Sequence, residues 1–201
     1  MKVIGLTGGI ASGKSTVTEI LKKRFSYIVI DADQLARQAV EPGSPGLNKI
    51  TAVFGGEVVD ENGELNRGMM GELIANDEQA RKKLNALVHP EIKKLYDQQI
   101  DFYQRAGVPA VFYDCPLLFE THLEKTVDET ILVVADRETR ISRIIERDGF
   151  SRQQAIKRID MQMLDEEKIV LADTIIENNG SQDDLLITID AYFSRRKLWV
   201  G

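Results

Sequence analysis

The chain has 201 residues, of which 43% are hydrophobic and 29% charged, and a formal net charge of −6. This acidic balance argues against nucleic-acid or anionic-membrane partners, because binding phosphates over a broad face needs clustered positive charge. With one cysteine, Cys115, the chain cannot form an internal disulfide, and no apolar run approaches the roughly 18 residues of a membrane span. We therefore expect a cytoplasmic protein, and its length indicates one main domain.

Five short apolar runs alternate with segments of helical periodicity along the chain. Near-continuous Val and Ile runs favour parallel strands that are buried on both faces. The strand candidates are Val3–Thr7, Tyr27–Asp31, Ala110–Asp114, Glu129–Ala135 and Asp173–Asn178. We therefore expect an α/β fold of three layers with a parallel five-stranded sheet. Met1 and Lys2 lead directly into the first run, so we expect no signal peptide.

The first strand candidate is followed at once by Gly8–Ser15, which matches the pattern G-x-x-x-x-G-K-[ST]. A helix is expected next, because apolar residues recur at helical spacing at Val17, Ile20, Leu21 and Phe25. In this context the loop N–H groups and the positive end of the helix dipole converge and favour a triphosphate. Lys14 is expected to reach the β and γ phosphates, and the Ser15 hydroxyl to bind Mg²⁺. A glycine-rich turn that binds nothing is the alternative.

The second strand candidate ends with Asp31 and Asp33 close to the carboxyl edge of the predicted sheet, where open α/β sheets bind ligands. A carboxylate there can accept the proton of an attacking hydroxyl or orient that hydroxyl toward the γ phosphate. Capping of the following helix is the structural alternative, and we expect it for one of the two. Asp33 is the preferred catalytic candidate.

The interval from Asp33 to Gly107 has no comparable strand and reads as mostly helical, so we expect an insertion at residues 34–106 beside the sheet. The third strand candidate ends at Asp114. An acid at this point can hold a magnesium ion directly or through water, although capping of a turn by Asp114 stays open. Cys115 is expected to be a small buried side chain.

Residues 138–168 read as a helical hairpin between the fourth and fifth strand candidates. Arg140, Arg143 and Arg147 are spaced by three and four residues and share one side of its first helix. In an acidic protein, such arginines suggest a lid that brings guanidinium groups onto the transferring phosphate and excludes water. A solvated face held by helical ion pairs is the alternative.

The hairpin also carries signals for where its helices end and begin. Gly149 is expected to end the first helix, because glycine readily adopts the left-handed conformation found after helix ends. Ser151 and Gln154 form a capping-box pattern that starts the second helix. The second helix bears Arg152 and Arg158.

Taken together, the motifs follow one another in the order seen in dephospho-coenzyme A kinases, which the chain resembles from Val3 to about Gly180. The motifs are LTGGIASGKST, DAD with AR shortly after, FG then LNR, HP at His89 and Pro90, DCPLLFE, an R-x-x-R-x-x-x-R-D run and ADTIIENNG. Only the phosphate loop is highly specific, and many kinases share it. The resemblance implies transfer of the γ-phosphoryl group of ATP to the ribose 3′-hydroxyl of dephospho-coenzyme A, the final step of coenzyme A synthesis.

The same resemblance implies roles for individual residues. Asp33 would act as base or orienter in catalysis with Lys14 and Arg140, Asp114 would lie near the metal and the acceptor ribose, and the insertion would hold the acceptor. Arg147 and Arg158 would be lid arginines. The residues expected to bind ATP are Gly9, Ile10, Ala11, Ser12, Gly13, Lys14, Ser15, Thr16, Arg140, Arg147, and, at the adenine pocket, Asn178 and Gly180.

Three positions depart from the family pattern or leave their role open. Ala11 replaces a glycine, and its methyl group should fit unless the residue needs a positive φ. Asn66 replaces an aspartate, which removes a carboxylate. His89 is either an acceptor contact or a local cap or packing element near a helix start.

Two rival functions stay open at this point. A nucleoside monophosphate kinase would share the loop, the lid and the magnesium carboxylate, and only residues of the insertion would distinguish it. A nucleotide switch is disfavoured, because a guanine-reading N-K-x-D pattern is missing and NKIT at Asn48–Thr51 lacks the acid. The oligomeric state is left open, and a monomer fits the sequence.

Overall fold

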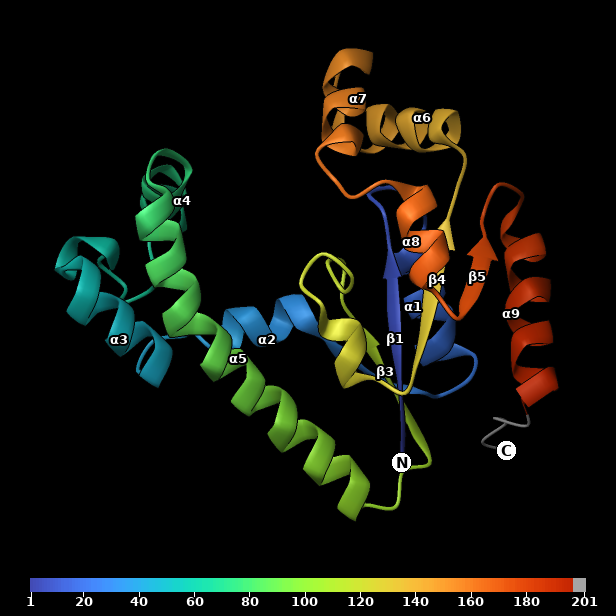
Figure 1. The fold of residues 1–201 in the computed structure, drawn as a ribbon, viewed down its shortest axis with the longest axis horizontal. Coiled ribbons are helices and arrows are strands. Elements are labelled where there is room, and N and C mark those ends of the chain that lie inside the picture. The colour runs from blue at the N-terminus through green and yellow to red at the C-terminus, as the bar shows by residue number, and fades with distance from the viewer. Residues whose placement is uncertain (197–201) are drawn as a thin grey trace. The chain divides into compact units, whose positions relative to one another are not determined.

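A computed structural model of the chain describes residues 1–196, except for the side chains of 195 and 196. These residues form two compact units, and Figure 1 labels most of their helices and strands. The sheet unit comprises Met1–Ile30 and the described residues from Gly107 onward, and the helical unit comprises Asp31–Ala106. Each unit has an apolar core of its own.

The sheet unit is built from strands that alternate with helices, as the sequence pattern predicts. The strand order is 2-3-1-4-5, and every pairing for which a register is given is parallel. All five strand candidates are confirmed, with bounds that differ by one residue at some ends. The elements are β1 (Lys2–Gly8), α1 (Lys14–Lys23), β2 (Ile28–Asp31, whose last residue begins the helical unit), β3 (Ala110–Asp114), η2 (Leu123–Thr126), β4 (Glu129–Val134), α6 (Arg137–Asp148), α7 (Arg152–Asp160), α8 (Asp165–Leu171), β5 (Thr174–Glu177) and α9 (Gln182–Arg196).

The central strand β1 ends at the point where the strand order reverses. Leu6 of β1 pairs with Asp114, the last residue of β3, and Gly8 pairs with Val133 of β4. The carboxyl ends of β1, β3 and β4 therefore meet at one edge of the sheet. Ligands of open parallel sheets bind at such a switch point, and the motif Gly8–Ser15 begins there.

An aromatic cluster joins one face of the sheet to the helices that cover it. Phe112 of β3 is fully buried, and its ring lies edge-on to Tyr27, with ring centroids 5.1 Å apart. Phe193 of α9 stacks on Tyr27 at 5.1 Å and contacts Phe25 at 4.5 Å. The apolar residues of α1 that were predicted from helical spacing are buried in the same cluster. α1 and α9 thus cover one face together.

The helical unit has its own small core, which its four α-helices surround. Ile50 is fully buried there beside Val58 and Met70. Asn66 is the N-cap of α4 (Arg67–Asn76), since its side-chain oxygen accepts a hydrogen bond from Met69 N at 3.0 Å. The expected mostly helical interval is confirmed by α2 (Ala32–Gln38), α3 (Pro45–Phe54), η1 (Gly56–Val58), α4 (Arg67–Asn76) and α5 (Glu78–Arg105).

The long helix α5 contains His89 and Pro90 in its interior. The expectation that His89 lies near a helix start is therefore wrong: the helix starts at Glu78, where Asp77 is the N-cap and accepts hydrogen bonds from Gln79 N and Ala80 N. Both His89 and Pro90 are exposed. Although α5 has 28 residues, no helix within the described part of the chain is long and apolar enough to cross a membrane.

The hairpin of α6 and α7 is confirmed together with its predicted turn. Gly149 ends α6 in the left-handed conformation with φ of 69°, and Ser151 and Gln154 form both hydrogen bonds of a capping box. Two ion pairs join the helices: Arg152 to Glu138 at 2.7 Å and Arg137 to Asp160 at 2.5 Å. The turn and the two ion pairs fix the hairpin as one body.

Replacement of Phe112 by alanine tests the aromatic core. We expect Phe112→Ala to lower the free energy of unfolding by about 3–5 kcal/mol, because the lost ring leaves a cavity between the sheet and α9. Phe102→Ala is the matched control, since Phe102 is 66% exposed and its loss should cost less than about 1 kcal/mol. Urea unfolding followed by circular dichroism measures both, and equal losses would contradict the assignment of the core.

Candidate active site

The phosphate loop between β1 and α1 has two glycines that no other residue could replace without a clash. A Cβ at Gly8 would lie 2.6 Å from Ser12 Oγ and 2.7 Å from the Val133 carbonyl oxygen. A Cβ at Gly13 would lie 1.9 Å from Asn178 Nδ2, and Gly13 has a φ of 93°. Gly13 is also the N-cap of α1 and offers no side-chain cap. The positive end of α1 therefore opens directly onto the loop, as an anion site requires.

Lys14 and Asp114 meet at the base of this loop. The Lys14 ammonium forms an ion pair with Asp114 Oδ1, and the Thr18 hydroxyl donates a hydrogen bond to Asp114 Oδ2 at 2.7 Å. Both side chains of the ion pair are largely buried. Two residues predicted for one site from distant parts of the sequence are thus in direct contact. Thr18 was not predicted, although its place one helical turn after Lys14 was a usable signal.

Arg140 is buried against the backbone of the phosphate loop. It is 2% exposed, and its Nε donates to the Ile10 carbonyl oxygen at 2.8 Å. Its Nη1 pairs with Asp165, and its Nη2 donates to Gln162 Oε1 at 3.1 Å. The same Gln162 oxygen accepts the Ile10 N–H at 2.8 Å. Both backbone groups of Ile10 are therefore held from α6 and from the segment before α8.

Arg143 contacts the next residues of the same loop. Its Nη1 lies 3.3 Å from the Ala11 carbonyl oxygen and 3.4 Å from that of Ser12, and its Nη2 donates to the Asn178 carbonyl oxygen at 2.9 Å. The amide of Asn178 donates in turn to the Ser12 carbonyl oxygen at 2.9 Å. From the sequence, Arg143 was expected to be a lid arginine on the same helix face as Arg140, and its contact with the loop backbone was not predicted. Sequence reasoning had no signal for Gln162 or Asp165.

Other predicted nucleotide residues lie apart from the loop or have other partners. Arg147 is exposed and forms two hydrogen bonds of 2.8 Å with its neighbour Asp148, which hold the pKa of the Asp148 carboxyl below its ordinary value. The Arg158 guanidinium lies over the Phe150 ring, 4.1 Å from its centroid. A Cβ on Gly180 would lie 2.6 Å from the Asp184 carboxylate in the first turn of α9. The roles of Arg147 and Gly180 in binding nucleotide and of Arg158 in the lid stay predictions.

Asp31 and Asp33 differ in what their carboxylates do. Asp31 is the N-cap of α2, and its Oδ1 accepts hydrogen bonds from Asp33 N at 2.8 Å and Gln34 N at 3.1 Å. The expectation that one of the two aspartates caps the helix is confirmed. Asp33 lies in the first turn of α2 and is exposed. Its catalytic role stays a prediction.

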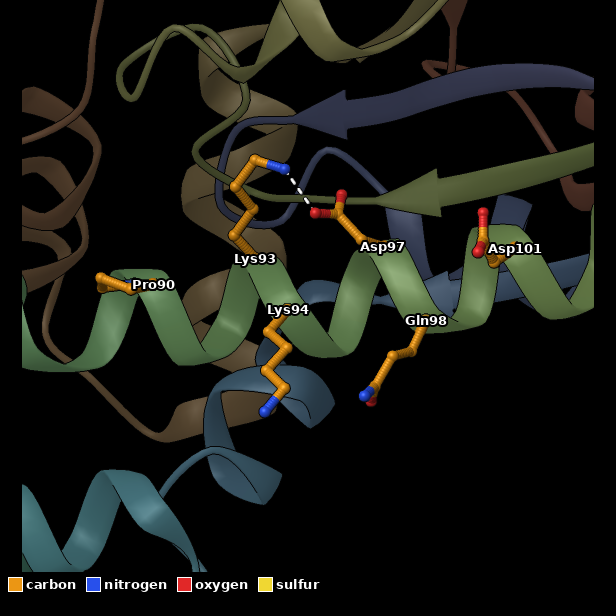
Figure 2. A pocket seen from close by; sticks show the side chains of 6 residues that line it. All are labelled: Pro90, Lys93, Lys94, Asp97, Gln98 and Asp101. Atoms are coloured by element: carbon orange, nitrogen blue, oxygen red, sulfur yellow. Dashed lines mark hydrogen bonds and ion pairs between the residues drawn. The ribbon is translucent and has the colours of Figure 1, made fainter.

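A separate pocket lies on α5 of the helical unit (Figure 2). Lys93 forms an ion pair there with Asp97, four residues later on the same helix. Two lysines and two aspartates line the pocket, so their formal charges cancel and do not favour an anionic ligand. The lining residues are Pro90, Lys93, Lys94, Asp97, Gln98 and Asp101.

The metal predicted at Ser15 and Asp114 would depend on oxygen donors from two elements. Within the described residues no group of three or more His, Cys, Asp and Glu side chains is arranged to hold a metal ion. A hydroxyl in the first turn of α1 and a carboxylate at the end of β3 are donors of the kind that Mg²⁺ uses together with phosphates and water. The residues present therefore fit magnesium bound with a nucleotide better than a metal held by protein alone.

A glycine-rich loop between a central parallel strand and a helix, with a lysine beside a strand-end aspartate, defines a P-loop kinase fold. The chain belongs to the dephospho-CoA kinase family, whose model matches residues 2–184. A curated dephospho-CoA kinase from Geobacter sulfurreducens is 43% identical over 98% of this chain and 99% of its own length. A solved dephospho-CoA kinase from Campylobacter jejuni is 28% identical with a TM-score of 0.74, covering 98% of both chains. A Thermus thermophilus crystal structure is 36% identical with a TM-score of 0.82, covering 96% of this chain and 97% of its own.

Ala11 adopts a positive φ, the conformation in which a residue other than glycine is strained. Its φ is 59°, in the left-handed region that favours glycine, so the exception stated for Ala11 applies and its backbone is strained. The side chain itself packs against an apolar cluster of the hairpin that includes Ile141 and Ile144. The methyl group fits its surroundings while the backbone is strained.

Glycine at position 11 should relieve this strain. We expect Ala11→Gly to raise the free energy of unfolding by up to about 1 kcal/mol, because glycine adopts a positive φ without steric cost. Ala155→Gly in α7 is the control, and it should lower the free energy of unfolding by about 1 kcal/mol or more. Urea unfolding compares the two, and a loss of stability in Ala11→Gly as large as in the control would show that Ala11 is unstrained.

Proposed function

We propose that this protein transfers the γ-phosphoryl group of ATP to the ribose 3′-hydroxyl of dephospho-coenzyme A and forms coenzyme A and ADP. Membership in the dephospho-CoA kinase family over residues 2–184 supports this function. In the structure, the phosphate loop supports this function most directly, because the N-terminus of α1 has no side-chain cap and Lys14 lies beside Asp114. A cytoplasmic location, and a monomer as its simplest state, complete the proposal.

The phosphate loop binds the nucleotide through the residues named from the sequence. The loop residues from Ala11 to Thr16 wrap the phosphates, and the Lys14 ammonium neutralises charge on the β and γ phosphates. Ser15 and Asp114 would hold Mg²⁺, which would supply charge neutralisation at the transferring group. Because phosphoryl transfer has a loose transition state, positioning and charge supply most of the catalysis.

Asp33 accepts the proton of the 3′-hydroxyl or orients that hydroxyl. It follows the end of β2 by two residues, in the first turn of α2. The cap that Asp31 provides fixes the backbone of this turn, which limits the freedom of Asp33. A carboxylate held on a capped turn is suited to orienting a hydroxyl toward the γ phosphate.

The remaining assignments concern the acceptor and the lid. Residues 34–106 hold dephospho-coenzyme A, and residues 138–168 form the lid. Arg140 contributes by holding the loop at the Ile10 carbonyl, which is supported by their hydrogen bond of 2.8 Å. Arg147 would exchange Asp148 for phosphate on closure, while Asn178 and Gly180 border the adenine.

A panel of acceptors distinguishes this function from that of a nucleoside monophosphate kinase. Purified protein with Mg²⁺ and ATP is mixed separately with dephospho-coenzyme A, AMP and other nucleotides, and ADP release and product mass are followed. We expect phosphorylation of dephospho-coenzyme A and none of AMP. Phosphorylation of AMP alone would overturn the acceptor and leave the kinase class intact.

Replacement of Asp33 tests its catalytic role. We expect Asp33→Asn to lower kcat by about a hundredfold or more with ATP binding nearly intact, because a positioned acid–base group acts mainly in the transition state. Asp31→Asn is the comparison, since asparagine caps a helix as well as aspartate does. Steady-state kinetics with dephospho-coenzyme A measure both variants. Near-normal turnover of Asp33→Asn would remove this residue from the mechanism.

Replacement of Lys14 should affect binding as well as rate. We expect Lys14→Ala to weaken ATP binding about tenfold and to lower kcat as well, since its charge acts in the ground state and the transition state alike. Lys23→Ala is the control on the same helix, because Lys23 is exposed and pairs with Glu19 one turn away. Calorimetric titration with ATP gives the affinities. An unchanged rate for Lys14→Ala would count against the site as a whole.

A further inference from the structure

The short helix α8 has its polar and apolar side chains in the reverse of the usual arrangement. Lys168 is its buried residue, at 0% exposure, whereas the following Val170 is 84% exposed and Leu171 48% exposed. Helices of globular proteins usually bury an apolar stripe and expose their lysines. A buried ammonium costs free energy unless it is paired, so the position of Lys168 needs a specific reason.

Lys168 is paired with a carboxylate that is itself buried. Its Nζ lies 2.6 Å from Oε1 of Glu120, in the segment that follows β3. Neither Glu120 oxygen nor Lys168 Nζ has a hydrogen bond of normal geometry within the described part of the chain. Each charge is therefore compensated by the ion pair, and removal of one partner would leave the other as an uncompensated buried charge.

The same helix carries Asp165, the partner of the arginine that contacts the phosphate loop. Asp165 lies one turn before Lys168 on α8 and pairs with Arg140 Nη1. Arg140 Nε donates to the Ile10 carbonyl oxygen at 2.8 Å. A continuous series of contacts thus runs from Glu120 through α8 to the phosphate loop.

We propose that Lys168 and Glu120 are positioning residues for ATP binding. Their ion pair seats α8 on the sheet unit, so that Asp165 keeps Arg140 against Ile10 and the loop keeps its shape. This inference rests on the proposed function, because it assigns the loop to the phosphates of ATP. It attributes to Lys168 an effect on nucleotide affinity in addition to any effect on stability.

A double-mutant cycle tests the proposed series of contacts. We compare Lys168→Met, Asp165→Asn and the double variant by calorimetric titration with ATP in the absence of acceptor. Lys168→Met should weaken ATP binding about tenfold alone but less than about twofold in the Asp165→Asn background, because both act through the same contact to Arg140. Independent effects that multiply in the double variant would overturn the proposal.

Replacement of both charges separates positioning from folding. Lys168→Met combined with Glu120→Leu leaves no unpaired buried charge, so its unfolding temperature should return close to that of the parent protein. If the ion pair positions α8, ATP binding stays weak in this variant. Recovery of both the unfolding temperature and the affinity would reduce the pair to a stabilising contact and overturn the proposal.

Lys2→Met is the matched control. Lys2 Nζ also lies 2.6 Å from a largely buried carboxylate, that of Glu129, but at the amino ends of β1 and β4, opposite the phosphate loop. This variant should lose stability and keep its ATP affinity within about twofold. An equal loss of affinity would show that loss of an ion pair remote from the loop has the same effect, and would overturn the proposal. Failure to phosphorylate dephospho-coenzyme A while ATP still binds would overturn the proposed function and leave this inference intact.

Discussion

The backbone of one loop, between β1 and α1, is the constraint on which the rest of the site depends. An anion is bound by N–H groups only if the loop curls tightly, and tight curling leaves no space for side chains at Gly8 and Gly13. Gly8 is closed in by β4 and by Ser12, and Gly13 by Asn178. Val133 of β4 and Asn178, which follows β5, both belong to the part of the sheet on the β4 side of β1.

The outer side of the loop is held by donors that bind its carbonyl oxygens. Arg140 donates a hydrogen bond to the Ile10 carbonyl oxygen, and Arg143 donates to those of Ala11 and Ser12. The side-chain amide of Asn178 donates a second hydrogen bond to the Ser12 carbonyl oxygen. Since these groups hold the carbonyl oxygens, the loop is fixed from its outer side. The same contacts explain how Ala11 is kept at a positive φ that alanine avoids when free.

Much of this architecture could be predicted from the sequence, since it rests on local patterns. The strands, the phosphate loop, the hairpin turn at Gly149 and the capping box follow from periodicity and turn chemistry, which act over a few residues. The partners of the loop could not be predicted in the same way. Gln162 and Asp165 are ordinary polar residues in sequence, and Glu120 ends the DCPLLFE motif without a sign of its partner. Only the tertiary fold brings the first two to Arg140 and the third to Lys168. The position of His89 was misjudged because proline usually marks a helix start, whereas α5 continues through Pro90.

Charged contacts rather than apolar packing join α8 to the site, and this choice has a physical consequence. Apolar packing tolerates small shifts of a helix, because dispersion contacts are numerous and individually weak. A buried ion pair such as Lys168 with Glu120 adds little net stability, since desolvation offsets most of the attraction, but it loses much when its geometry changes. The pair between Arg140 and Asp165 has the same property. Ionic anchors therefore define the place of α8 more sharply than they stabilise it, which suits a helix whose Asp165 holds Arg140 of α6 against the phosphate loop.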